Sequence, residues 1–253
     1  MATVQRAASR QTRPKRAATA KIVPDYELVE SDGEPLDSAW HRDAIALLID
    51  VLTWRFRHRS DYYVGGNMFI YFSPKRSRQR DYRGPDFFFV DGVPRYPQRL
   101  YWAVWEEGDR FPDFLLELLS ASTAKVDRTT KKKIYERTFR THEYCMYDPD
   151  KKKLEGFRLD ARGRYKPIKP NEQGWLWIEK LGLRLGLWDG KYLASEETWP
   201  RFYDTDGQLI PTVAEAHERR AEASERRVDA AEAEVERLKA LLAKRNKDGP
   251  QPS

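Results

Sequence analysis

Hydrophobic and polar positions repeat with different periods along the chain, and each change of period marks a new element. From Ser38 to about Arg59, apolar residues recur at helical spacing. This pattern predicts an amphipathic helix that begins at Asp37 or Ser38 and covers one face of a sheet. Its inward positions are Ala44, Leu47, Leu48, Val51, Leu52 and Arg55. His41 falls in the first turn, where a surface or packing role is more common than a ligand role.

Short apolar runs bounded by turn residues predict strands. Residues 62–64 and 68–72 flank Gly65-Gly66-Asn67, a sequence typical of a β-hairpin turn. A basic loop at residues 73–83 follows. Further strands are expected at residues 86–90, 102–105, 114–119 and 143–147, with a second helix after residue 119. Helices alternating with strands predict an α/β or α+β fold, with a central mixed β-sheet flanked by helices.

Beyond residue 150 the pattern is short and β-rich, which predicts hairpins that extend the sheet or cover its edge. Residues 213–242 are instead rich in Ala, Glu and Arg and follow a heptad repeat. The a positions are Ala214, Ala221, Val228, Val235 and Leu242, and the d positions are His217, Ser224, Ala231 and Leu238. In a parallel pair, the g to e′ contacts Arg220–Glu225, Arg227–Glu232 and Glu234–Lys239 are all opposite in charge. We therefore expect a coiled-coil-like helix and a homodimer, with a single solvated helix as the alternative.

These patterns predict five segments. Residues 1–22 form a disordered basic tail, residues 23–205 a globular domain, and residues 206–212 a linker. Residues 213–245 form the helical segment, and residues 246–253 a disordered end.

Charge is distributed unevenly over the 253 residues. The net charge of +6 lies entirely in the first 21 residues, which have six basic and no acidic side chains, so the remainder is neutral. A basic tail alone indicates at most weak affinity for phosphate. The single cysteine, Cys145, excludes an intramolecular disulfide and fits a cytoplasmic protein. No apolar run reaches the length of about 18 residues that a membrane helix needs, so no membrane partner is expected.

Glu117 stands in the middle of the apolar strand at residues 114–119. A buried carboxylate costs several kcal/mol unless a cation or hydrogen-bond donors meet it. The following helix, with possible capping oxygens on Ser120, Ser122 and Thr123, places Lys131 on its inward face. The other inward positions of that helix are Ile134, Tyr135, Thr138 and Phe139. Glu117 and Lys131 thus indicate an active site for a polyphosphate or a metal, or else a buried ion pair without chemistry.

Two Pro-Asp pairs precede Glu117. Asp113 lies on the same strand, roughly 13 Å away at about 3.3 Å per residue, whereas carboxylates that share a divalent ion lie within about 5 Å. Asp86 comes from a separate strand, and neighbouring strands are about 4.8 Å apart. Asp86 and Glu117 can therefore share a hard cation.

Four motifs now stand in order along the chain: Gly84-Pro-Asp-Phe-Phe-Phe-Val90, Pro112-Asp-x3-Glu-Leu-Leu-Ser-x-Ser-Thr123, Asp127-x3-Lys-x3-Tyr135 and Glu143-Tyr-x2-Tyr-Asp-Pro149. Together they resemble the Uma-type family of bacterial proteins assigned as endonucleases, within the restriction-endonuclease-like PD-(D/E)XK superfamily. The resemblance covers about residues 25–205. It implies a nuclease-like domain with a restriction-endonuclease-like core, and a Mg²⁺- or Mn²⁺-dependent endonuclease that hydrolyses DNA.

The resemblance also assigns roles to residues. Asp86 and Glu117 are the two acids, and with the backbone carbonyl of Leu118 they hold the metal. The usual lysine position, two residues after Glu117, is occupied by Leu119, and the resemblance transfers the role to Lys131. Lys132 and Lys133 are expected to be solvated. Lys75, Arg76, Arg78, Arg80 and Arg83 are the expected DNA contacts, with a solvated loop as the alternative.

The departure at Leu119 and the neutral body leave a second function open. In that alternative, the chain is a catalytically inactive nuclease fold that acts as an interaction or nucleic-acid-binding module through its C-terminal helix.

Overall fold

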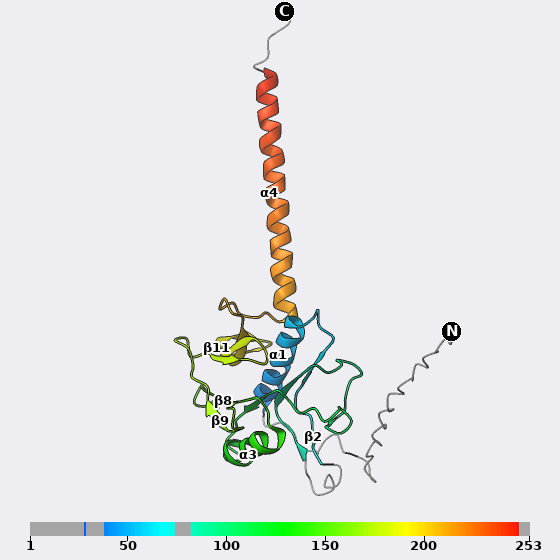
Figure 1. Ribbon diagram of the computed structural model, residues 1–253. Helices are drawn as coiled ribbons and strands as arrows, with labels where there is room; N and C mark the ends of the chain where they lie inside the picture. The colour runs from blue at the N-terminus through cyan, green and yellow to red at the C-terminus, as the bar shows by residue number, and fades with distance from the viewer. Residues whose placement is uncertain (1–27, 29–37, 74–81, 248–253) are drawn as a thin grey trace, which may run out of the picture.

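A body of β-sheets and helices carries one long helix that projects away from it (Figure 1). The computed structural model describes residue 28 and residues 38–73 and 82–247, with side chains up to residue 242. The expected basic tail, most of the C-terminal end and most of the basic loop lie outside these residues. No helix in the described part is both long and apolar enough to cross a bilayer.

The centre of the body is a six-stranded mixed sheet in the order β1-β4-β6-β7-β8-β9. Only the pairing of β6 with β7 is parallel. The predicted mixed sheet flanked by helices is thus confirmed. The strands are β1 Tyr62–Gly65, β4 Phe87–Asp91, β6 Phe114–Leu118, β7 Glu143–Asp148, β8 Lys153–Leu159 and β9 Tyr165–Pro167.

Two smaller sheets accompany the central one. The first has the order β3-β2-β5 and consists of β2 Ile70–Tyr71, β3 Tyr82–Arg83 and β5 Trp102–Ala103. The second has the order β10-β11-β12 and consists of β10 Leu176–Ile178, β11 Leu183–Tyr192 and β12 Ser195–Tyr203. The β-rich region beyond residue 150 therefore extends the central sheet through β8 and β9 and also forms a separate sheet.

One face of the central sheet is covered by α1 (Ala39–Arg55) and the sheet of β10 to β12. The Ser38 hydroxyl accepts a hydrogen bond from the His41 backbone N–H at 3.1 Å, so α1 begins with the expected serine cap. The apolar side of α1 packs on alternate residues of β4 and β6, including Phe87, Phe89 and Leu116. This face contains the larger of the two apolar cores.

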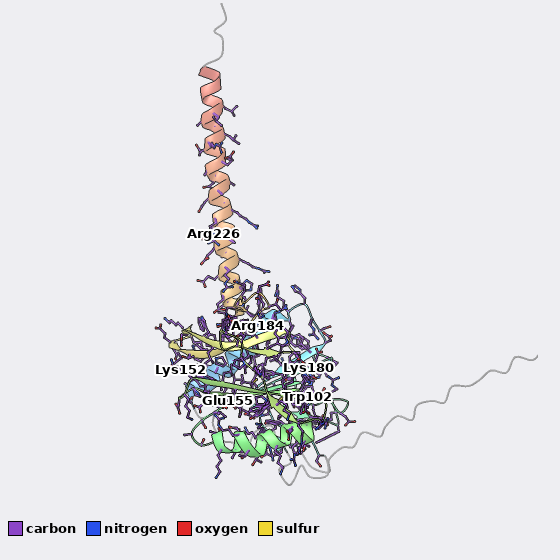
Figure 2. All side chains as sticks on the ribbon, turned by 60° about the vertical axis from the view of Figure 1, so that its left-hand side comes forward. Trp102, Lys152, Glu155, Lys180, Arg184 and Arg226 are labelled. Atoms are coloured by element: carbon purple, nitrogen blue, oxygen red, sulfur yellow. The ribbon has the colours of Figure 1, made fainter. Side chains whose placement is uncertain are left out.

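The opposite face is covered by a helical segment made of α2 (Ala124–Val126), η2 (Asp127–Lys131), α3 (Lys132–Ile134) and η3 (Tyr135–Phe139) (Figure 2). The η elements are π-helical turns. In an α-helix, residues spaced by four are displaced by about 40° around the helix axis, so a long series of them drifts away from one face. A π turn contains more residues and reduces that drift. Asp127, Tyr135 and Phe139 are buried as a result, and Lys131 shares their side, whereas Thr138 is exposed, contrary to the prediction.

The predicted hairpin at Gly65-Gly66-Asn67 is wrong, because β1 and β2 belong to different sheets. A Cβ atom on Gly66 would lie 2.4 Å from Ile45 Cγ2 and 2.8 Å from the Asp86 carbonyl oxygen. Gly66 therefore permits the chain to pass between α1 and the start of β4. The Asn67 N–H donates to that same Asp86 carbonyl at 3.1 Å.

The long helix α4 (Val213–Lys247) is anchored only at its beginning. Buried Arg201 of β12 pairs with Glu215 at 2.8 Å, and Asp50 of α1 accepts from the Val213 N–H at 3.4 Å. The His217 ring contacts Trp54 of α1. Farther along, Val228, Val235, Leu238, Leu241 and Leu242 are each about half exposed. The predicted C-terminal helix is present, and its apolar stripe faces solvent.

Candidate active site

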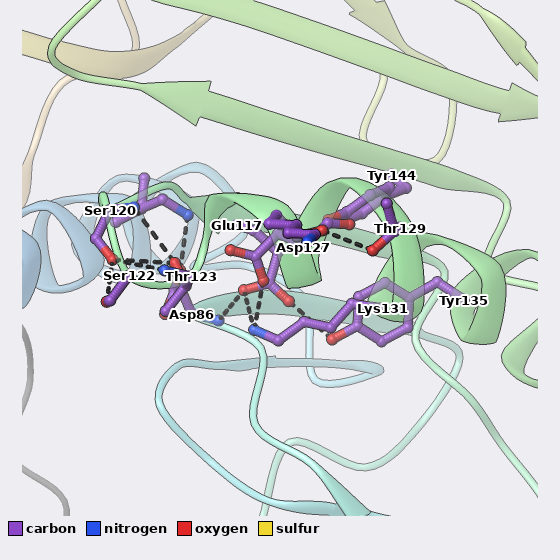
Figure 3. A network of polar contacts seen from close by, with 12 residues as sticks. Asp86, Glu117, Ser120, Ser122, Thr123, Asp127, Thr129, Lys131, Tyr135 and Tyr144 are labelled. Carbon is purple, nitrogen blue, oxygen red and sulfur yellow. Dashed lines mark hydrogen bonds and ion pairs between the residues drawn. The ribbon is translucent and has the colours of Figure 1, made fainter.

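The pairing of β4 with β6 brings the two predicted acids together. Phe87 lies opposite Leu116, so Asp86, just before β4, lies beside Glu117. The Asp86 backbone N–H donates to Glu117 Oε2 at 3.3 Å, and the Leu118 N–H donates to Asp86 Oδ2 at 2.7 Å. The two carboxylates are therefore tied to each other's strands at one end of the sheet (Figure 3).

Glu117 is fully buried on the sheet face under the helical segment. Lys131 Nζ lies 3.1 Å from its Oε2, and the Tyr135 hydroxyl donates to its Oε1 at 2.8 Å. Burial raises the pKa of Glu117 to about 8. The positive charge of Lys131 lowers this pKa, but the negative charges of Asp86 and Asp127 oppose that effect. Glu117 is thus a carboxyl group that carries a proton near neutral pH when nothing further neutralises the cluster.

Lys131 joins two acids of different elements. Its Nζ lies 2.9 Å from Asp127 Oδ1, one helical step away, as well as 3.1 Å from Glu117 (Figure 3). Burial disfavours the ammonium form, but Glu117, Asp127 and Asp86 together raise the pKa of Lys131 above its ordinary value. Lys131 therefore remains a fixed cation at the edge of the carboxylates.

Asp86 is held from the other side of the sheet by His41 of α1. The His41 ring is buried, and its Nε2 lies 2.9 Å from Asp86 Oδ1. Burial alone would raise the pKa of Asp86, but the hydrogen bond and charge of His41, with Lys131 and the Leu118 N–H, hold that pKa below its usual value. The sequence predicted a surface or packing role for His41. In the structure its side chain also contacts Asp86, one of the predicted active-site acids.

The charges of this cluster are unequal. Three carboxyl groups, on Asp86, Glu117 and Asp127, surround one ammonium, on Lys131. When all three are ionised and His41 is neutral, the cluster has two negative charges in excess. Burial is the main cause of the raised pKa of Glu117, and the negative charges of Asp86 and Asp127 raise it further. Carboxylate oxygens are the donors that Mg²⁺ and Mn²⁺ prefer, and Mg²⁺ is commonly bound through one or two carboxylates and several waters. The donor set and charge of the cluster therefore fit a divalent hard cation.

Several predicted residues take other positions. The Leu119 side chain packs in the core of the helical face, so the position two residues after Glu117 supplies no polar group. Lys133 is exposed as expected, but the Lys132 ammonium lies 3.2 Å from the centre of the Phe157 ring, so it is not simply solvated. Lys75, Arg76, Arg78 and Arg80 lie outside the described residues. Arg83 donates to the Tyr82 carbonyl at 2.5 Å and lies 6.0 Å from the centre of the Phe72 ring.

Three residues of the cluster were not assigned a role from the sequence: His41, Asp127 and Tyr135. Signals for them were present. His41 precedes Ala44 by three residues and Leu48 by seven, which places it on the inward side of α1. Asp127 and Tyr135 flank Lys131 at a spacing of four residues.

A second group of potential metal ligands lies at the opposite end of β7. His142, Glu143 and Glu179 have ligand atoms within 4.8 Å of one another. Arg158 already pairs with both glutamates at 2.8 Å, and the Glu179 and Lys180 N–H groups donate to Glu143. These oxygens are therefore satisfied by the protein itself.

Comparison with known proteins identifies the family of this chain. The chain matches the sequence profile of the Uma2 family, described as a putative restriction endonuclease, over residues 17–196. No curated protein shows significant similarity to it. Among solved structures, a putative nuclease belonging to DUF820 from Anabaena variabilis ATCC 29413 is similar with a TM-score of 0.44 and 13% identity, over 58% of this chain and 76% of that one. Because the profile matches well over half of the 253 residues, the chain belongs to the Uma2 family of putative restriction endonucleases.

Proposed function

We propose that this protein is a metal-dependent endonuclease that hydrolyses phosphodiester bonds of DNA, with Asp86, Glu117 and Lys131 as its catalytic residues. The observation that supports this best is their convergence. The two acids lie side by side on β4 and β6, and the lysine ammonium lies 3.1 Å from the deeper acid. Family membership supports nuclease activity, while the metal and the DNA substrate are our proposals.

Asp86 and Glu117 would hold Mg²⁺ or Mn²⁺, with the backbone carbonyl of Leu118 as a further ligand. When bound, the metal would supply positive charge that polarises the scissile phosphate and acidifies a water. The excess negative charge of the cluster supports this assignment. Glu117 would lose its proton when the metal binds, because the cation replaces the proton in balancing that charge.

Lys131 would act on the reacting phosphate. Its ammonium is held by Glu117 and Asp127 together, so its position is fixed before substrate arrives. A fixed cation stabilises the charge that develops on phosphate oxygens, and it can orient the attacking water through an N–H bond. It would not act as a base, since its raised pKa keeps it protonated.

Two further residues would position the acids. The Tyr135 hydroxyl, from the helical segment, would fix the orientation of the Glu117 carboxyl group. The His41 ring, from α1, would fix the orientation of the Asp86 carboxylate. Groups that orient metal ligands influence metal affinity strongly. Five basic residues that precede β4 in the sequence would contact the DNA backbone, and they are Lys75, Arg76, Arg78, Arg80 and Arg83.

We also propose that the chain forms a parallel homodimer through α4. The three g to e′ pairs are opposite in charge in a parallel arrangement. The stripe of Val228, Val235, Leu238 and Leu242 is exposed and would supply most of the association. In a parallel dimer both bodies lie at the same end of the helices, which would permit cleavage of both strands of a duplex.

We propose a cytoplasmic location, since Cys145 is a free, buried thiol in a chain with no second cysteine. The second candidate function is the inactive module that acts through α4. The specific observation in its favour is Leu119, whose side chain leaves the usual lysine position without a polar group.

Metal binding distinguishes the two functions. Titration with Mn²⁺ by calorimetry should give a heat of binding for the wild-type protein and none for Glu117→Gln. Glu143→Gln would serve as a matched control, because that acid is equally buried but bonded to Arg158. Equal behaviour of wild type and Glu117→Gln would favour the inactive module.

A further inference from the structure

A cavity of about 270 Å³ opens beside the candidate active site, between the start of α1 and the end of β7. Its walls include Trp40, Tyr147, Asp150, Lys152 and Glu197. None of these residues has a role in the proposed hydrolysis. The size is at the small end for ligand sites, which suits a single flat group rather than a large cofactor.

The cavity is tied to the catalytic cluster through two elements. Trp40 immediately precedes His41, whose ring lies against Asp86. Tyr147 lies opposite Leu118 in the pairing of β7 with β6, and the Leu118 N–H binds Asp86. A nucleotide in this cavity would therefore lie next to a phosphate at the acids.

The aromatic walls are fixed in place. The Trp40 ring is stacked with Trp199, with ring centres 5.8 Å apart and planes 12° apart, and it lies 5.9 Å from the Tyr147 ring. The Tyr147 hydroxyl donates to the Thr198 carbonyl at 3.1 Å. Tyr147 is fully buried, so it helps to hold the Trp40 ring in place, and the half-buried Trp40 ring is the aromatic surface of the cavity. A rigid aromatic surface favours a planar ring, because such a ring can stack without ordering mobile side chains.

The polar groups at the rim select among planar rings. Asp150 and Glu197 are exposed, and within the described part of the chain neither has a hydrogen-bond or ion-pair partner. Lys152 is the only cation among the lining residues, and it lies 3.8 Å from Asp189. Two unpaired carboxylates repel a phosphate, and they accept hydrogen bonds from N–H groups. The rim thus fits a neutral ring that carries an amino group.

We infer that this cavity binds one unstacked nucleobase of the substrate strand, with the half-buried Trp40 ring as its aromatic wall and Glu197 as acceptor for an amino group. The inference rests on the proposed function, since it concerns the same substrate. Adenine, cytosine and guanine carry an amino group that can donate a hydrogen bond to a carboxylate, whereas thymine carries none. The cavity would therefore give the nuclease a base preference next to the cut.

Photo-crosslinking tests the placement directly and needs no cleavage. The full-length protein in EDTA would be mixed with single-stranded and duplex oligonucleotides, each with one 5-iodocytosine at a different position. Irradiation followed by peptide mapping should give an adduct on Trp40 at one position. Adducts confined to other residues would overturn the inference while leaving the nuclease proposal intact. Absence of any DNA binding or cleavage would overturn both.

Glu197→Gln tests the base preference, with Glu196→Gln as its control. The two residues are neighbours on β12, so their side chains point to opposite faces of the strand. Both substitutions remove one negative charge. Relative affinity for cytosine over thymine at the crosslinked position should fall by about fivefold or more in Glu197→Gln, given the usual strength of such contacts. It should be unchanged in Glu196→Gln. Equal changes in the two variants would contradict a specific acceptor role.

Discussion

Replacement of Glu117 by Gln should make the metal-free protein more stable at alkaline pH. Glu117 is fully buried, and its pKa is raised to about 8. The folded wild-type protein therefore binds a proton that the unfolded chain releases above about pH 4.5. Its stability falls as the pH rises from about 4.5 to about 8, because ionisation is costly only in the folded state. A glutamine carries no such charge, so the variant lacks this decline.

The size of the effect follows from the shift in pKa. A difference of about 3.5 units between the folded and unfolded states corresponds to roughly 5 kcal/mol, at about 1.4 kcal/mol per unit. The amide fits the same contacts, since its oxygen can accept from Lys131 and its NH₂ group can donate to the Tyr135 hydroxyl oxygen. We therefore expect the variant to exceed wild type by several kcal/mol at pH 9 and to be within about 1 kcal/mol of it at pH 5.

Urea unfolding in EDTA from pH 5 to pH 9 measures this difference. Titrating groups away from the cluster contribute equally to both proteins, so the gap between the two curves reports Glu117 together with the charges that interact with it. Glu143→Gln should show no stabilisation at pH 9, because removal of that charge leaves Arg158 without its buried partner. Parallel curves for wild type and Glu117→Gln would refute the reasoning.

Three further predictions concern the lysine, the histidine and the long helix. Lys131→Ala should reduce cleavage by about 100-fold or more and retain most metal binding, whereas exposed Lys133→Ala should cleave normally; equal losses would exclude Lys131 from its role. His41→Asn should weaken Mn²⁺ binding by about 10- to 100-fold in calorimetry, and unchanged affinity would limit His41 to packing. Val235→Glu should abolish self-association in sedimentation experiments, whereas Ala233→Glu, on the outer side of the heptad, should not. Dimers that persist in the Val235 variant would place the contact elsewhere.

The sequence predicted the convergence of the acids because local rules determine it. A carboxylate inside an apolar strand needs a partner, and the spacing between strands leaves Asp86 as the one that can reach it. The inward face of the following helix then identified Lys131. In the structure Asp86 lies opposite Glu117, and Lys131 contacts Glu117.

Other features depend on contacts between distant segments, which periodicity does not report. Gly66 was interpreted as a turn residue, but it is required where the chain passes close to Ile45 and the Asp86 carbonyl. His41 lies on the inward side of α1, yet nothing local indicates that Asp86 would be its partner. The π turns at residues 127–131 and 135–139 also could not be predicted from a helical repeat of apolar residues. They align Asp127, Lys131 and Tyr135 on one side of the helical segment.

Cleavage of a supercoiled plasmid by the full-length protein tests the central claim most directly. Wild type should nick or linearise the DNA with Mg²⁺ or Mn²⁺ and should be inactive in EDTA. Asp86→Asn and Glu117→Gln should lose that activity, and Glu143→Gln should retain it if purified in folded form. Cleavage by the Asp86 and Glu117 variants at the wild-type rate, or activity that persists in EDTA, would contradict the account.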